Sequence, residues 1–545
     1  MSLLPLPAAN IPGDKRLWQG VHGSGSALAI AEACQQHRGL TVVITDSARN
    51  ASQLESELQF FLGGQVPVFH FPDWETLPYD LFSPHQDIIS ERLRTLFRLP
   101  QIDYGIVVVP VTTLMHRLPP VEFVSQRAFE YHTGDQLDLN DLRTKLEHSG
   151  YRYADTVIEH GEFTVRGSLV DIYPMGAKLP FRIDLFDNEI ETLRTFDPDT
   201  QRTLTQTDHI CVLPAREVPL DTSAIRRFKN NWLTHFDVDH RRCPVYQDVS
   251  EGITSQGIEY FLPLFFEKCS TLFDYLPDNC LVFSEGAIDQ AAEKFWRELS
   301  ERYQEYNIDP TRPLLAPNEV FLPVSELFSH LKHYPRTQLI ENNDIKSSAS
   351  SGTKNTLSLA IQSPQNVAVI PKEDNPLKQL EHYLLATNQR VLFCAESAGR
   401  RETLLELLAR IDIHPIEIAG WSEFVDSAHQ LAITVYPLAR GLSLDTPAIC
   451  LISESELFGQ QVMQRRRRSK QREDADQVIK NLTELRVGAP VVHIDHGVGR
   501  YRGLQTITTN GEPQEFLTLE YAGEAKLYVP VASLHLISRS EEHTS

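Results

Sequence analysis

Residues 157–203 read VIEHGEFTVRGSLVDIYPMGAKLPFRIDLFDNEIETLRTFDPDTQRT, and this stretch decides the fold of the middle of the chain. Three segments alternate apolar and polar residues with a period of two, and turn residues separate them, which predicts a compact antiparallel meander. The period places Ile183 on one face of its strand and Arg182 and Phe186 on the other. By the same rule Arg166 points outward from the preceding strand. The stretch therefore predicts one core face and one decorated face.

Arg166, Arg182 and Phe186, here called the recognition face, predict a site that binds another protein. Arginine and aromatic side chains combine a large contact area with strong hydrogen bonds, and they are typical anchors of protein interfaces. A second interpretation is that Phe186 packs under a neighbouring helix while the arginines pair with nearby acidic residues. Composition alone favours this second interpretation. The candidate acidic partners are Asp184, Asp187 and Glu191.

The composition indicates several soluble domains. With 545 residues, of which 41% are hydrophobic, the chain is long enough for about three to five domains. The formal net charge of -22 repels a phosphate backbone, so protein partners are expected over most of the surface. Seven scattered cysteines without a C-x-x-C pair predict a cytoplasmic location, without a zinc ribbon or a disulfide framework. No apolar run approaches the roughly 18 residues of a membrane-spanning helix, so no membrane partner is expected.

Residues 1–125 alternate helix and strand signals and predict the first part of a parallel α/β domain. Gly20 and Gly25 keep the glycine spacing of a phosphate loop, but Ser26 and Ala27 stand where a lysine and a hydroxyl residue should bind phosphate and magnesium. We therefore expect a degenerate loop that does not bind nucleotide. A tight strand-to-helix turn explains the glycines without any ligand.

The C-terminal region predicts a small β-barrel. Asn510-Gly511 is a strong hairpin signal, and the segments FLTLEY and KLYVPV alternate as strands do. Ile507 lies between Thr506 and Thr508 on a strand that could present an edge to a partner's sheet. A core position inside the small barrel explains Ile507 equally well.

These patterns divide the chain into a multidomain α/β protein with an inserted antiparallel β domain. The basic run 465–472 can bind DNA phosphate or pair with acidic surface, and the acidic chain favours a linker role. The expected segments are an α/β domain in two parts (1–125 and 216–341), the inserted β-rich domain (126–215), a Ser-rich linker (342–356), a second small α/β domain (357–457), a basic linker (458–484) and the β-barrel (485–540).

Two of these segments resemble known modules. The order GEF-x-VRG-x(2)-VDI-x-P, then FRI-D-x-F-D-x-EIE, then FDP-x-T-x-R resembles the module of the excision-repair protein UvrB that docks on its partner UvrA. The segments VVH-x-x-HG-V-G-x-Y and KLYVPV resemble the CarD-like, polymerase-interacting module of transcription-repair coupling factors. In this order, the two modules are similar to the N-terminal half of that bacterial family.

The resemblance implies a helicase-like α/β domain, a Tudor/SH3-like barrel and two protein partners. The recognition face would contact UvrA, so that Arg182→Glu is expected to abolish UvrA binding and to spare polymerase binding. Ile507, with Thr506 and Thr508, would contact the β subunit of RNA polymerase. In the family a motor that uses ATP and magnesium releases stalled polymerase and makes most DNA contacts.

This chain is expected to supply the adaptor surfaces of a monomer, without a catalytic residue, a metal or a cofactor of its own. It contains no intact G-x(4)-G-K-[ST], and Ser284, Glu285 and Gly286 stand where the related UvrB would have an adjacent Asp and Glu. Two alternatives come from other classes: an active excision-repair nuclease component or helicase, and an autoinhibitory piece whose interaction faces are covered.

Overall fold

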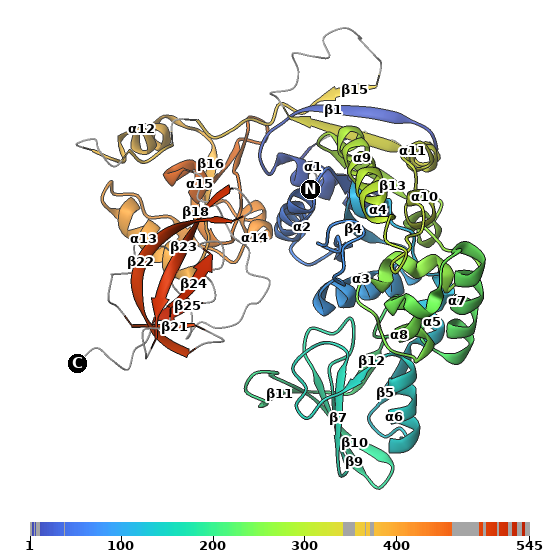
Figure 1. Cartoon of the computed structure of the whole chain (residues 1–545). Coiled ribbons are helices and arrows are strands. Elements are labelled where there is room, and N and C mark those ends of the chain that lie inside the picture. The colour runs from blue at the N-terminus through green and yellow to red at the C-terminus, as the bar shows by residue number, and fades with distance from the viewer. Residues whose placement is uncertain are drawn as a thin grey trace. The chain divides into compact units, whose positions relative to one another are not determined.

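The computed structural model describes two compact units, residues 1–460 and 461–545, which are considered separately (Figure 1). The described residues of the first unit are 3–4, 6, 11–37, 39–341, 355–365, 367–370 and 375–459. Those of the second are 490–493, 497–509, 512–521, 526–530 and 537–539. The basic run near residue 468 lies outside them. Among the described residues, no helix is long and apolar enough to cross a membrane.

A seven-stranded sheet forms the base of the first unit, with every neighbouring pair of strands parallel. Its order is β15-β1-β14-β13-β2-β4-β3. The strands are β1 (Lys15–Val21), β2 (Leu40–Thr45), β3 (Val68–His70), β4 (Gly105–Pro110), β13 (Leu281–Glu285), β14 (Arg336–Glu341) and β15 (Thr356–Ser358). The parallel sheet fits the predicted α/β fold class, and its strands come from residues 15–110 and 281–358.

Helices cover both faces of this sheet, as expected for parallel strands that read as continuous runs of Val and Ile. On one face Val43 and Val108 pack with α1 and α2, and on the other face Val42 and Val107 pack with α3. The helices of the two parts are α1 (Gly25–His37), α2 (Ala48–Leu62), α3 (Gln86–Arg98), α4 (Val111–Leu114), α5 (Val121–Arg127), α7 (Thr222–His235), α8 (Pro244–Ser250), α9 (Ile288–Tyr306), α10 (Pro317–Val320) and α11 (Val324–Leu331), with short 3-10 turns η1 (Leu99–Gln101), η2 (His240–Arg242), η3 (Ile258–Leu264) and η4 (Leu272–Tyr275).

The sheet reaches beyond the predicted domain end at residue 341. Strand β15 pairs in parallel with β1, where Leu357 lies opposite Trp18. Residues 342–354 of the predicted linker lie outside the described residues, whereas Thr356 already belongs to β15. The chain therefore adds an edge strand to the first sheet before it enters the next domain.

The inserted domain is a six-stranded sheet of order β11-β10-β9-β8-β7-β6, antiparallel except for the β6–β7 pair. The meander has more strands than the three predicted segments, because left-handed residues open two extra hairpins: Gly167 has φ 63° and Asp187 has φ 55°. The strands are β6 (Arg152–Tyr153), β7 (Glu162–Arg166), β8 (Leu169–Ile172), β9 (Phe181–Phe186), β10 (Glu189–Phe196) and β11 (Thr203–Thr207); the pair β5 (Phe129–His132) and β12 (His209–Val212) and helix α6 (Leu139–His148) complete the insert.

A second α/β domain follows, as predicted, around the sheet β17-β18-β16-β20-β19. Only β19 runs antiparallel to its neighbour. Its elements are α12 (Lys378–Ala386), β16 (Arg390–Ala395), α13 (Ala398–Ala409), β17 (Ile416–Glu417), α14 (Trp421–Asp426), β18 (Leu431–Val435), β19 (Leu442–Leu444), β20 (Ile449–Ser453) and α15 (Glu454–Phe458). Side chains of α14 and β19 share one core with α1 and α2, so the two α/β domains are packed together.

The second unit is an antiparallel sheet of order β24-β23-β22-β21-β25. Its strands are β21 (Pro490–His493), β22 (Gly497–Thr509), β23 (Glu512–Glu520), β24 (Lys526–Pro530) and β25 (Ile537–Arg539). Strands β22 and β23 pair as far as Thr509 and Glu512, on either side of Asn510-Gly511, which lies outside the described residues. Among the described strands β24 and β25 are not paired with each other, so the closed barrel stays a prediction.

Candidate functional site

The recognition face lies on strands β7 and β9 of the inserted sheet (teal to green in Figure 1). Ile183 and Leu185 are buried in the core, while Arg182 and Phe186 occupy the alternate positions of β9. Phe186 is 69% exposed, so the interpretation that it packs under a helix is wrong. The predicted division into a core face and a decorated face is confirmed.

Asp171 of β8 joins the two arginines of this face. It lies directly opposite Arg182 in the strand register. Arg182 Nε donates to Asp171 Oδ1 at 2.7 Å, and Arg182 Nη2 donates to Oδ2 at 2.9 Å. Arg166 Nη2 donates to the same Oδ2 at 2.5 Å. The hydrogen bond to Asp171 raises the pKa of Arg182, which keeps this guanidinium charged.

The arginines therefore do have an acidic partner, but it is not one of the residues named from the sequence. Among those, Asp184 pairs with Arg194 Nη2 at 2.9 Å. Sequence reasoning missed Asp171, although its place between the apolar Val170 and Ile172 puts it on the polar face of its strand. The missing information was the register between β8 and β9.

The members of the recognition face differ in accessibility. The Arg166 side chain is 52% exposed, whereas that of Arg182 is 16% exposed. Arg182 also lies over the Phe196 ring at 4.8 Å, and its Nη1 donates to the Gln201 carbonyl at 3.4 Å. Phe186 and Arg166 thus offer the accessible surface, and Arg182 lies mostly below it.

The degenerate phosphate loop joins β1 to α1 and is covered by the chain itself. Ile361 N donates to the Gly20 carbonyl at 2.9 Å, and Ile361 is fully buried. A Cβ on Gly25 would lie 2.7 Å from Ile361 Cγ2, and one on Gly23 would collide with the Gly441 carbonyl oxygen. Residues from beyond the first domain therefore fill the space that faces the loop. This packing is a steric reason, in addition to the missing lysine, why the loop should not bind nucleotide.

The residues expected at a phosphate and metal site lie at a partly buried acidic cluster of Glu285, Asp46 and Glu341. Ser26 and Ala27 are buried in the first turn of α1. Burial raises the pKa of Glu285, to which Ser26 is hydrogen-bonded and near which the charge of Arg440 lies. Arg440 Nη1 also forms an ion pair with Glu341 Oε1 at 2.7 Å. A guanidinium from the second α/β domain thus supplies positive charge to this cluster.

One further group has metal-ligand chemistry that the sequence did not reveal. His70 Nδ1 lies 3.5 Å from Glu55 Oε2 and 3.9 Å from Glu91 Oε1, where β3, α2 and α3 meet. A protonated imidazole between two carboxylates accounts for the same geometry. The spacing in the sequence gives no signal, because the three residues come from three elements.

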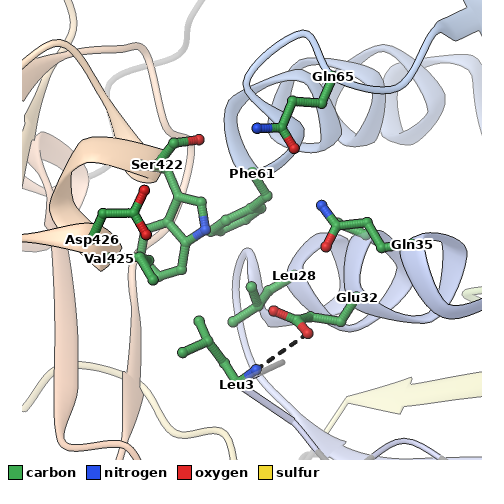
Figure 2. A pocket seen from close by; sticks show the side chains of 11 residues that line it. Leu3, Leu28, Glu32, Gln35, Phe61, Gln65, Ser422, Val425 and Asp426 are labelled. Atoms are coloured by element: carbon green, nitrogen blue, oxygen red, sulfur yellow. Dashed lines mark hydrogen bonds between the residues drawn. The ribbon is translucent and has the colours of Figure 1, made fainter. Parts of the chain in front are cut away.

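A small cavity lies where α1 and α2 meet α14 (Figure 2). Its volume is about 190 Å³, and Phe61 and Trp421 are among its lining residues. Glu32 Oε2 accepts a hydrogen bond from Leu3 N at 3.2 Å at its edge. The cavity belongs to the packing between the two α/β domains.

Ile507 lies on β22 opposite Gln514 of β23, flanked by the pairs Thr506–Glu515 and Thr508–Pro513. Strand β21 pairs only with the other end of β22, up to Arg500. Among the described residues, the half of β22 that holds Ile507 is therefore paired on one side only. This backbone edge is the feature that the sequence predicted.

Three family models match successive parts of the chain. They are the UvrB interaction domain over residues 129–218, the MFD D3 domain over 383–457 and the CarD-like/TRCF RID domain over 485–540. The recognition face lies inside the first match and Ile507 inside the third. The chain thus combines a domain similar to the UvrB interaction domain with domains similar to MFD D3 and to the CarD-like/TRCF RID domain.

The predicted resemblance to transcription-repair-coupling factors is confirmed. The chain is 43% identical to the transcription-repair-coupling factor of Escherichia coli (strain K12) over 528 residues, which are 97% of this chain and 45% of that protein. It is 41% identical to that of Haemophilus influenzae over 531 residues, again 97% of this chain and 45% of the relative. The match to the Bacillus subtilis protein is 26% over 546 residues. The chain spans less than half the length of these relatives.

Proposed function

We propose that this chain is an adaptor of transcription-coupled DNA repair that binds UvrA through the recognition face. The observation that carries the proposal is the exposure of Phe186 and Arg166 on the same face of the sheet, inside the match to the UvrB interaction domain. An exposed aromatic residue and an exposed arginine on one face are the residue types that anchor many protein interfaces. Single exposed apolar residues are common on protein surfaces, so the support comes from the place of Phe186 on the face that holds Arg166 and inside the matched domain.

The second partner in this proposal is the β subunit of RNA polymerase, bound through the one-sided edge of β22 around Ile507. An exposed strand edge offers unpaired N–H and C=O groups, which can extend a partner's sheet. The match to the CarD-like/TRCF RID domain supports this assignment. The two contacts lie in different units of the chain, so one molecule could hold both partners.

In the longer relatives, the ATP-driven release of stalled polymerase and most DNA contacts would involve residues outside this chain, which acts as a monomeric adaptor. The chain itself would not turn over ATP, because Ile361 covers the glycine loop and Ser26 replaces the phosphate-binding lysine. This packing disfavours the alternative of an active nuclease component or helicase. That alternative needs a loop that is open to nucleotide.

Calorimetric titration of purified UvrA into the 545-residue chain tests the first contact. Phe186→Ala is expected to weaken binding by about fivefold or more, since truncating an interface anchor typically costs over ~1 kcal/mol. Ile308→Ala is the matched control, because Ile308 is 82% exposed but lies outside the insert. Equal affinities of the wild type and Phe186→Ala would rule out this use of the face.

A further inference from the structure

Asp171 is the buried centre of the recognition face. Its side chain is fully inaccessible to solvent, yet it belongs to the polar side of the sheet. Across the three strands, Thr164 of β7 and Arg182 of β9 flank it in register. Its two carboxylate oxygens accept three hydrogen bonds from the two arginines. A buried carboxylate is stable only when it is paired and hydrogen-bonded in this way.

The shared carboxylate also fixes two like charges on β7 and β9, the two strands that flank β8. Without it, the guanidinium groups of Arg166 and Arg182 would repel each other, and the exposed one would sample many rotamers. Ordering such a side chain at the moment of binding weakens an interface, whereas ordering it beforehand strengthens the interface. Asp171 does this ordering within the free chain.

The two arginines have different roles: Arg182 bonds within the domain, and Arg166 faces solvent. Arg182 uses Nε, Nη1 and Nη2 in bonds within the domain, so it has little left to offer a partner. Arg166 bonds to Asp171 through Nη2, and about half of its side chain faces solvent. Its other N–H groups can therefore receive a carboxylate in the bidentate geometry that arginine favours.

We infer that Asp171 is a positioning residue of the UvrA-binding face, which holds Arg166 ready to bind an acidic side chain of the partner. This inference rests on the proposed function. Arg182 then supports the face from below, and Phe186 supplies an exposed apolar anchor on the same face. Neither the family description nor the sequence pattern singles out Asp171 for this role.

The test measures UvrA affinity for Arg166→Lys, Arg166→Ala, Asp171→Asn and the double variant Arg166→Ala/Asp171→Asn. Arg166→Lys keeps the charge at an exposed site and is expected to fold, yet it should lose about tenfold in affinity, nearly as much as Arg166→Ala. Asp171→Asn should also lose about tenfold, and this loss should vanish in the Arg166→Ala background. Circular dichroism checks that each variant is folded.

The inference would be overturned if Arg166→Lys bound UvrA with wild-type affinity. It would also be overturned if Asp171→Asn lowered the UvrA affinity equally in the wild type and in the Arg166→Ala background. If Asp171→Asn does not fold, Arg166→Lys alone decides. NMR of nitrogen-15-labelled arginine gives a readout that needs no UvrA: the Arg166 guanidinium should rotate slowly in the wild type and freely in Asp171→Asn. If the Arg166 guanidinium rotates slowly but the wild-type chain does not bind UvrA, the positioning role of Asp171 stands and the proposed function is wrong.

Discussion

Replacing Arg182 by glutamate is expected to destabilise the inserted domain rather than to remove a contact cleanly. The new carboxylate would face Asp171, whose side chain is fully buried and would lose both hydrogen bonds from Arg182. The interaction of the guanidinium with the Phe196 ring would be lost as well. The loss of UvrA binding that the sequence predicted for this variant would then have a different cause.

The magnitude follows from the buried pair. Removing one partner of a buried ion pair costs about 3–5 kcal/mol. For a domain of roughly 60–100 residues, each kcal/mol lowers Tm by about 4–8 °C. The melting transition of the insert should therefore fall by at least about 10 °C. Circular dichroism melting with limited proteolysis of the insert measures this shift.

Arg194→Glu is the matched control for Arg182→Glu. It makes the same charge reversal on the next strand, but its partner Asp184 is one-third exposed. A surface pair contributes about 0–1 kcal/mol, so the Tm should change little. An Arg182→Glu variant that melts within about 2 °C of the wild type would refute the reasoning, since Asp171 would then tolerate a neighbouring negative charge.

Three further predictions concern other parts of the chain. The double variant Ser26→Lys/Ala27→Thr restores the phosphate-loop residues but should not bind ATP, because Ile361 still covers the loop. Binding is measured with a fluorescent ATP analogue. Saturable binding would show that Ile361 does not exclude nucleotide. Ile507→Arg should weaken capture of RNA polymerase on an immobilised chain while the circular dichroism spectrum stays unchanged, and loss of the folded signal would instead assign Ile507 to the core. Burial raises the pKa of Glu57 to about 8, so its contribution to stability is present below about pH 4 and is lost as the pH rises to about 8. Glu57→Gln should flatten this part of the pH profile in urea unfolding, and identical profiles for the two chains would contradict the assignment.

Local patterns in the sequence were sufficient to predict which residues of the inserted sheet face the core and which face outward. The two-residue period separated Ile183 from Arg182 and Phe186, because one face of an antiparallel sheet packs on the core. The same pattern could not identify Asp171 as the partner of both arginines. That pairing depends on the register between β8 and β9, which the hairpin turns determine together.

Long-range packing could not be predicted from the sequence either, because contacts between distant segments leave no local pattern. The glycine spacing of the loop was evident, but Ile361 and Gly441 reach it from more than three hundred residues along the chain. Strand β15 likewise joins the first sheet from the junction between the predicted linker and the predicted second α/β domain. Neither segment carries a local signal for its partner, since each contact forms only when the two α/β domains pack together.

The most direct measurement of the adaptor claim is size-exclusion chromatography with light scattering of the chain mixed with UvrA and the β subunit of RNA polymerase. The account predicts one species with the mass of all three proteins, formed without ATP. It also predicts that Phe186→Ala releases only UvrA and Ile507→Arg only the polymerase subunit. Partners that displace each other, or a complex that both variants leave intact, would contradict it.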